Sequence, residues 1–241
     1  MKHYLMVDLG TGNSRVALVD SDGGILGLRT YTNVYHRDSA YEDGQYFLPE
    51  DWAALLLQGC RELCREHPDI QVDAVSAAGA RQSFVLLDGN GRAFLGLPNI
   101  DNRGRAYMAQ VPEHDEIYRL SGKWATEDFG AAKLLGLRMQ HPEQYEAVES
   151  VLSLSEWIAW IFTGRKVMEY TQACESQLYD IGQRSWSQTL CSFYGLRPEF
   201  LPPLQAAGTA VGPILDTYRR ELGMAKDAVF VLGGADTQIA L

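Results

Sequence analysis

The sequence lacks any long apolar run, and it lacks the paired cysteines that hold zinc. No segment reaches the ~18 uninterrupted apolar residues of a membrane-spanning helix, and the four-residue apolar run after Lys2 and His3 is too short for a signal peptide. The chain has four cysteines, none of them in a CxxC pair: Cys60, Cys64, Cys174 and Cys191. We therefore expect a cytoplasmic protein with reduced thiols, no membrane partner and no zinc site.

Positive charge is also scarce. The chain has 21 basic residues against 31 acidic ones, and the resulting net charge of −10 repels nucleic acid, so no nucleic-acid partner is expected. Hydrophobic residues make up 46% and charged residues 22% of the chain, which is typical of a soluble globular protein and excludes a disordered or fibrous class. A chain of 241 residues can bury a full hydrophobic core.

What the sequence does contain is a hairpin pattern close to its N-terminus. Two short apolar runs, residues 4–7 and 16–19, flank the turn residues 10–14. This pattern predicts two strands joined by a tight loop whose residues have positive φ. A further apolar stretch at 25–31 extends the prediction to a three-stranded antiparallel meander.

The residues of this turn favour phosphate binding. Glycines let backbone N–H groups face an anion, while hydroxyl, amide and guanidinium groups add donors. The predicted phosphate-facing residues are Gly10, Thr11, Gly12, Asn13, Ser14 and Arg15. Asp8, at the edge of the turn, is placed to hold Mg²⁺ through water. The alternative is an ordinary hairpin in which Asp8 and Asn13 only stabilise the turn.

Further along, the hydrophobic pattern predicts alternating helices and strands. We expect a surface loop of about thirteen residues after residue 31. The expected strands are residues 72–78, 84–88, 92–97, 211–215 and 228–232. The expected helices are residues 49–67, 105–120, 131–140, 142–162, 186–194 and 218–222. The helices in the middle of the chain form a block between strand-rich parts, which indicates an insertion.

A central strand and a hairpin place polar residues near a ligand cleft. The run 72–78 has no polar alternation, which is typical of a strand buried on both faces. Because ligand clefts form at the carboxyl ends of such strands, the residues after Gly79 are candidates for substrate contact: Ala80, Arg81 and Gln82. The following hairpin delivers Asn99, Asp101 and Arg103 to a loop. For Asp101 and Arg103, an internal ion pair is the alternative to substrate contact.

The last predicted strand leads directly to a carboxylate. Gly233 and Gly234 follow residues 228–232 and let the backbone approach a ligand closely, and Asp236 then stands at the start of a helix. The alternative role for Asp236 is that of an N-cap for this helix. Since a domain rarely ends at such a point, we expect the 241 residues to be the front portion of a longer polypeptide.

Five segments taken together resemble the FGGY family of carbohydrate kinases. They are, in chain order, DLGTGNSR, SAAGARQSFVLLD, PNIDNR, EYTQACES and GGADTQ. The resemblance covers essentially the whole chain and corresponds to the N-terminal half of such an enzyme. It implies that residues 1–241 form an α/β, ribonuclease H-like domain of the actin/Hsp70-type ATPase superfamily. This domain would have a mixed five-stranded sheet flanked by helices, with helical and hairpin insertions, and a second, nucleotide-binding domain would follow it.

The resemblance implies transfer of the γ-phosphoryl group of ATP, with Mg²⁺, to a hydroxyl of a small sugar or polyol. Asp236 matches the catalytic aspartate, which accepts the hydroxyl proton, and Asp8 matches the carboxylate near Mg²⁺. The implied substrate contacts are Ala80, Arg81, Gln82, Asn99, Asp101, Thr237 and Gln238. The implied partners are the sugar, ATP and the protein's own C-terminal domain, without which this fragment is expected to be inactive. A homodimer is left open.

The chain also departs from the family pattern. It has Arg81-Gln82 where several relatives have Arg-Glu, which leaves the substrate open, although the NIDNR loop resembles the autoinducer-2 kinase branch. A non-catalytic nucleotide- or partner-binding protein of the same superfamily is the alternative function, and such a protein would not need a carboxylate at Asp236. A free-standing domain that binds a small molecule is a third possibility.

Overall fold

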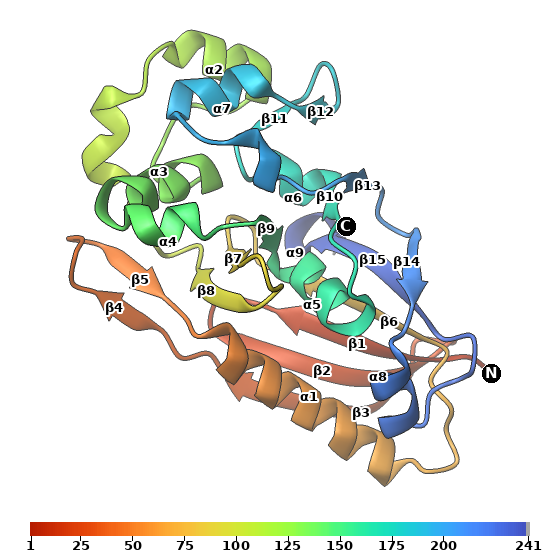
Figure 1. Cartoon of the computed structure of the whole chain (residues 1–241). Helices are drawn as coiled ribbons and strands as arrows, with labels where there is room; N and C mark the ends of the chain where they lie inside the picture. Colours follow the sequence, from red (N-terminus) through yellow and green to blue (C-terminus); the bar gives the residue numbers. More distant parts are fainter. Residues whose placement is uncertain (240–241) are drawn as a thin grey trace.

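The computed structural model describes residues 1–239, and its centre is a mixed sheet of six strands (Figure 1). The order across the sheet is β14-β15-β6-β1-β2-β3. The strands are β1 (His3–Leu9), β2 (Asn13–Asp20), β3 (Ile25–Thr32), β6 (Ala74–Gly79), β14 (Ala210–Pro213) and β15 (Val229–Ala235). Strands β1, β6 and β15 run parallel to one another, whereas β2, β3 and β14 are antiparallel to their neighbours.

The predicted N-terminal meander is confirmed, but the conformation of its first turn is not the expected one. Strand β1 pairs with β2, and β2 pairs with β3, in antiparallel register. Neither Gly10 nor Gly12 has a positive φ. Because Leu9 pairs with Ser14, the loop is four residues long, and loops of that length are most often built around a type I turn, which needs no left-handed residue.

The sheet has one strand more than the five that were expected. The sixth is β14, which is the strand predicted near residues 211–215, and it pairs antiparallel with β15 at the edge of the sheet. The backbone bond from Ile214 N–H to the Ala228 carbonyl, 3.0 Å long, closes the connection between the two strands. The ribonuclease H-like α/β class is otherwise as predicted.

A second, three-stranded antiparallel sheet contains a strand that was predicted as part of a helix. Its order is β8 (Ala93–Leu97), β7 (Phe84–Leu87) and β9 (Ser150–Ser153). The helix predicted over 142–162 was wrong at its centre, because α4 (Pro142–Glu146) and α5 (Leu154–Thr163) are separated by β9. All four residues of β9 are buried against β7, so strand pairing overrides the local helical pattern.

Two further expectations are corrected by short elements. The helix predicted over 105–120 is broken into η1 (Arg105–Gln110) and α2 (His114–Ser121), because Pro112 lacks an N–H and restricts the residue before it. The expected surface loop after β3 contains a small hairpin, β4 (His36–Asp38) with β5 (Gly44–Tyr46).

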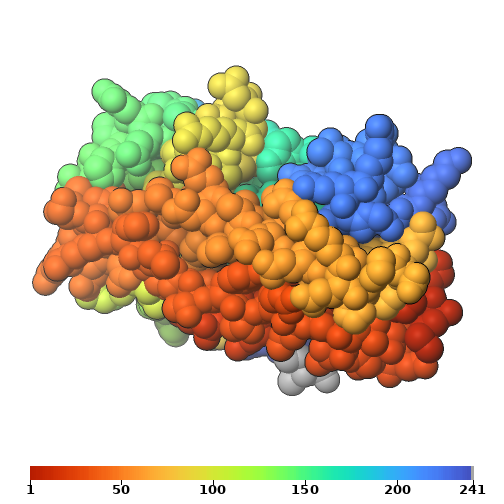
Figure 2. All heavy atoms as spheres, turned by 90° about the horizontal axis from the view of Figure 1, so that it is seen from below, coloured from red at the N-terminus to blue at the C-terminus, as the bar shows by residue number. Residues whose placement is uncertain are grey.

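Helices α1 (Pro49–Glu66) and α5 pack on the same face of the large sheet. Figure 2 shows α1 in orange, lying beside the red N-terminal strands. The opposite face is less covered, since Met6 and Leu28 are 41% and 47% exposed. Within residues 1–239, no helix is both long and apolar enough to cross a membrane.

Strand β7 separates two hydrophobic cores. All four of its residues are buried; Val85 and Leu87 belong to the core beneath α1 and α5, whereas Phe84 and Leu86 belong to a second core. That second core is formed with α2, α3 (Gly130–Gln140) and α7 (Gln188–Tyr194). The remaining short elements are β10 (Met168–Glu169), α6 (Tyr170–Cys174), β11 (Tyr179–Asp180), β12 (Ser185–Trp186), η2 (Pro198–Phe200), β13 (Leu204–Gln205), α8 (Asp216–Glu221) and α9 (Asp236–Ile239).

Candidate active site

The carboxyl ends of three neighbouring parallel strands meet at one edge of the large sheet. Gly79, the last residue of β6, pairs with Leu9 of β1 on one side and with Ala235 of β15 on the other. The residues that follow these strands therefore leave the sheet side by side, where ligand clefts form in open α/β sheets. The first turn, the segment after Gly79 and Asp236 come from distant parts of the sequence, and this topology brings them together.

The first turn carries an ion pair and is held by hydrogen bonds to Asn33. Asp8 and Arg15 face each other across the hairpin, and Arg15 Nη1 donates to Asp8 Oδ2 at 2.7 Å. Asn33 donates from its side chain to the Gly10 carbonyl at 2.8 Å and accepts from the hydroxyl of buried Ser14 at 2.7 Å. The Ser14 hydroxyl is therefore used inside the turn, whereas Asp8 and Arg15 are partly exposed.

Asn99 connects the predicted substrate region to this turn. Its side-chain nitrogen donates to Thr11 Oγ1 at 2.8 Å, although the two residues are 88 positions apart. Its backbone N–H donates to Ser83 Oγ at 2.9 Å, so the loop that begins after β8 is held against the end of β6. The structure thus places a predicted substrate contact beside a predicted phosphate contact.

The segment after β6 combines an unusual backbone with exposed charge. Gln82 has a φ of 60°, which is uncommon for a residue other than glycine, and such conformations cluster at functional sites. Ala80 is buried, and its N–H donates to the Leu9 carbonyl at 2.8 Å. Arg81 is exposed, with Nη1 3.9 Å from Oε1 of Glu175.

Asp236 begins the short helix α9 and is partly exposed. Its Oδ1 accepts from the N–H of Thr237, the next residue, at 2.7 Å. An N-cap side chain usually accepts from the second or third N–H of the helix, so this contact differs from the usual cap. Thr237 and Gln238 are exposed and share a hydrogen bond of 2.6 Å between Oγ1 and Oε1.

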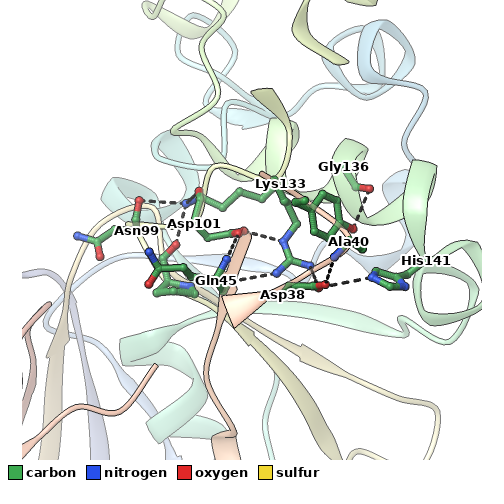
Figure 3. Close-up of polar contacts among 11 residues, drawn as sticks. Asp38, Ala40, Gln45, Asn99, Asp101, Lys133, Gly136 and His141 are labelled. Atoms are coloured by element: carbon green, nitrogen blue, oxygen red, sulfur yellow. Dashed lines mark hydrogen bonds and ion pairs between the residues drawn. The ribbon is translucent and has the colours of Figure 1, made fainter. Parts of the chain in front are cut away.

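Asp101 is set apart from the other predicted site residues by its burial. It has no exposed surface; its Oδ1 accepts from the Gln45 N–H at 2.8 Å, and its Oδ2 accepts from Arg103 Nε at 2.7 Å (Figure 3). Burial raises the pKa of Asp101, and the charges of Arg103 and Lys133 oppose that rise. This position fits the internal ion pair, which the sequence left as the alternative to substrate contact.

Lys133 is a functional candidate that sequence reasoning missed. It is fully buried, and its ammonium group donates to the carbonyls of Pro98 at 2.7 Å, Asn99 at 3.2 Å and Asp101 at 2.7 Å (Figure 3). Burial lowers the pKa of Lys133 to about 8. The lysine therefore fixes the backbone of the loop that carries Asn99. The available signal was a single charge within the apolar, small-residue run GAAKLLGL of α3.

Glu175 and Lys123 were missed as well. The Glu175 side chain is 3% exposed, and its Oε1 accepts from Lys123 Nζ at 3.1 Å in addition to lying near Arg81. Its Oε2 is buried and has no hydrogen-bond partner among the residues that the structure describes. Glu175 lies in the EYTQACES segment. The resemblance of this segment to a family motif did not imply a role for the Glu175 side chain.

Comparison with known proteins gives a family for this arrangement. The model of the FGGY family of carbohydrate kinases, N-terminal domain, matches residues 3–241. The protein named "Putative sugar kinase YoaC" of Bacillus subtilis is 41% identical over 241 residues, which are the whole chain and 49% of that protein. An "Autoinducer-2 kinase" of Salmonella choleraesuis is 28% identical over 98% of the chain and 46% of its own length.

The fold has close counterparts among solved structures. The ligand-bound xylulose kinase from Lactobacillus acidophilus superimposes with a TM-score of 0.87 at 20% identity, over 98% of this chain and 48% of that one. At this identity the likeness shows the fold alone. The chain spans about half the length of the curated relatives it matches.

Proposed function

Because this chain belongs to the FGGY family of carbohydrate kinases, we propose that the protein containing it transfers the γ-phosphoryl group of ATP to a hydroxyl group of a small sugar or polyol. The observation that carries this proposal is the meeting of three strand ends at one edge of the sheet. That edge presents a turn suited to phosphate, a segment suited to a sugar, and a carboxylate suited to take a proton. Phosphoryl transfer needs mainly this positioning of reactants and the neutralisation of charge.

Asp236 is the proposed general base. It follows β15 directly, and its neighbours on the sheet edge are the first turn and the Arg81-Gln82 segment. A carboxylate in this place can accept the proton of the attacking hydroxyl as the new bond to phosphorus forms. Thr237 and Gln238, exposed beside it, are proposed to contact the same substrate.

The first turn is proposed to face the phosphates of ATP through Gly10, Thr11, Gly12, Asn13 and Arg15. Asp8 is proposed to hold Mg²⁺, which neutralises phosphate charge when bound. Within residues 1–239 no three His, Cys, Asp or Glu side chains form a ready metal cluster. One carboxylate fits this ion, because Mg²⁺ usually keeps several waters and takes further oxygens from substrate phosphates.

The sugar is proposed to lie against the segment after β6. Ala80, Arg81, Gln82 and Asn99 are the candidate contacts, whereas buried Asp101 is proposed to brace the loop. Gln82 brings hydrogen-bonding groups without charge. Autoinducer-2, named for one group of relatives, and xylulose, named for a structural counterpart, belong in the first panel of substrates to be assayed.

A C-terminal domain is proposed to complete the enzyme. The relatives are about twice as long as this chain, and the sheet edge that presents the proposed site residues needs a second wall to enclose ATP. Residues 1–241 alone should therefore show little sugar-dependent ATP consumption in a coupled assay, whereas the full-length protein should show robust turnover. Equal activity of the two would contradict the proposed division of labour.

The test of the function is Asp236→Asn in the full-length protein. Asparagine keeps the size of the side chain but cannot take a proton, so kcat should fall about 10²–10⁴-fold while sugar affinity changes little. The matched control is Asp69→Asn, which changes an exposed carboxylate outside the site and should leave kcat unchanged. Near-normal kcat in Asp236→Asn would defeat the base assignment. Tight sugar binding without turnover in the wild type would favour a non-catalytic binding protein.

A further inference from the structure

The short helix α6 touches the ends of both strands that carry the proposed sugar and base residues. The N–H of Ala235, the last residue of β15, donates to Thr171 Oγ1 at 3.2 Å. The side-chain nitrogen of Gln172 donates to the carbonyl of Gly79, the last residue of β6, at 3.0 Å. Two adjacent residues of one helix therefore hold the two backbone positions that directly precede Asp236 and Ala80.

Strand β15 needs such support because its ladder with β6 is irregular at this end. The register between the two strands shifts between Val231 and Gly234. At the shift, Gly233 lies so close to the Ala77 carbonyl that a Cβ on Gly233 would meet the oxygen at 1.8 Å. Beyond the shift only Gly234 and Ala235 pair with β6, opposite Ala78 and Gly79, so a polar partner from outside the sheet adds to a short ladder at this end of β15.

The hydroxyl of Thr171 is held in the orientation that this contact requires. It donates its only hydrogen to Oε2 of Glu169, a residue that is 3% exposed. The same Glu169 oxygen accepts from the Thr171 N–H at 2.7 Å and caps the start of α6. The lone pairs of the hydroxyl oxygen are thus left to accept from Ala235.

Gln172 is confined on the other side by its burial, while its Oε1 has no hydrogen-bond partner among the residues that the structure describes. Its side chain has no exposed surface, and its nitrogen also lies 3.4 Å from Ser155 Oγ. An amide buried in this way has few alternative orientations, so it fixes the Gly79 carbonyl that it contacts. Nothing in the proposed function so far uses either Thr171 or Gln172.

We propose that Thr171 and Gln172 are positioning residues that set the proposed base, Asp236, at a fixed place relative to the sugar segment after Gly79. This inference rests on the proposed kinase function. The physical reason is that reacting groups must be held within a fraction of an ångström, and that a misplacement of about 1 Å can cost about 10²-fold in rate. Both residues act through the backbone and touch no substrate.

The proposal predicts that substitutions of two neighbouring residues change different kinetic parameters. Thr171→Val keeps the shape of the side chain but removes the acceptor for Ala235, so kcat should fall about 10–100-fold with little change in the sugar KM. Thr171→Ser restores the hydroxyl and should keep kcat within about threefold of the wild type. Gln172→Met removes the donor to Gly79, so the sugar KM should rise about tenfold with a smaller change in kcat.

The matched control is Thr163→Val. The hydroxyl of Thr163 is also buried, but it donates to the Ala159 carbonyl of its own helix at 2.6 Å and lies outside the site. This variant removes the same chemical group and should leave kcat and KM unchanged. If Thr171→Val does not fold, Thr171→Ala and Gln172→Met provide the same comparison.

A second readout is independent of activity. Loss of the Thr171 hydroxyl frees the Ala235 N–H, so in the full-length protein the hydrogen exchange of this amide should accelerate about tenfold or more in Thr171→Val and stay slow in Thr171→Ser. Unchanged exchange, or faster exchange with unchanged kcat, would overturn the proposal. If the wild type phosphorylates no sugar, the kinase proposal fails and the positioning of a base fails with it, while exchange still decides whether Thr171 fixes the strand end.

Discussion

Two buried polar clusters lie behind the candidate site. One contains cationic side chains, and the other contains none. The Lys133 cluster comprises Asp38, Asp101, Arg103 and Lys133: Arg103 forms ion pairs with Asp101 at 2.7 Å and with Asp38 at 3.6 Å, and the ammonium group of Lys133 donates to backbone carbonyls, including that of Asp101. The Glu156 cluster comprises Ser155, Glu156, Glu169, Thr171 and Gln172, and its contacts are made by hydroxyl, amide and carboxyl groups. Two equally buried titratable side chains can therefore differ in charge, because their charge depends on the groups that surround them.

The difference in charge matches the part of the structure that each cluster holds in place. The Lys133 cluster fastens a loop to the β4–β5 hairpin and to α3, where salt bridges can span segments that are distant in sequence. The Glu156 cluster lies beside the strand end that carries Asp236. Burial raises the pKa of Glu156 to about 8, and the nearby carboxylate of Glu169 adds to that rise.

The largest expected effect follows from breaking the first cluster. Lys133→Met keeps the length of the side chain but leaves three carbonyl groups and a buried carboxylate without the ammonium group, so the free energy of unfolding should fall by about 3–5 kcal/mol. Urea unfolding measures this. Lys226→Met, at an exposed lysine, is the control and should stay within about 0.5 kcal/mol of the wild type. If the free energy of unfolding falls no more in Lys133→Met than in Lys226→Met, Lys133 does not stabilise the fold.

The second cluster is tested through its pH dependence. The folded-state pKa of Glu156, about 8, lies above the ordinary value of 4.5. Below pH 4.5 both folded and unfolded states are protonated; as the pH rises toward 8, only the unfolded state ionises, so the folded state loses stability. Glu156→Gln removes this titration. Between pH 5 and 8 its free energy of unfolding should rise relative to the wild type by more than about 1.4 kcal/mol, the equivalent of one pKa unit.

Thermal or urea unfolding of both proteins at pH 5, 6, 7 and 8 gives this difference directly. Glu146→Gln, at an exposed glutamate, provides the matched control, and its difference from the wild type should not vary over the same range. Parallel stability profiles for wild type and Glu156→Gln would show that Glu156 is ionised when folded. That result would remove the contrast between the two clusters.

The sequence was informative where a single segment contains the whole signal. The short apolar runs before Asp8, Gly79 and Asp236 predict strands, and the parallel pairing of those strands places their ends together. The wrong predictions have two causes, a distant strand partner in one case and a local proline in the other. Ser150–Ser153 becomes a strand only because β7 lies beside it, and Pro112 breaks a helix whose apolar spacing continues past it.

The ion pair between Asp101 and Arg103 was available from the sequence as an alternative, but the other members of the two buried clusters could not be predicted. Lys133 meets carbonyls more than thirty residues away, and Thr171 meets an N–H 64 residues away. Spacing along the chain carries no signal at such separations. A lone lysine in an apolar run and a Thr-Gln pair in a polar segment mark positions where charge or hydrogen bonding is buried, but not which backbone groups they serve.

The smallest expected effect concerns Glu175, which is buried like Glu156 but faces cations like Asp101. If partners decide charge, Glu175 acts as the anion that orients Lys123 and Arg81, and Glu175→Gln should weaken sugar binding about tenfold, or about 1.4 kcal/mol, because Arg81 loses its anchor. Calorimetric titration of the full-length protein with its sugar measures this, with Glu146→Gln again as the control. An unchanged Kd would mean that Glu175, like Glu156, is a buried acid beside the site that does not orient Lys123 and Arg81 for sugar binding.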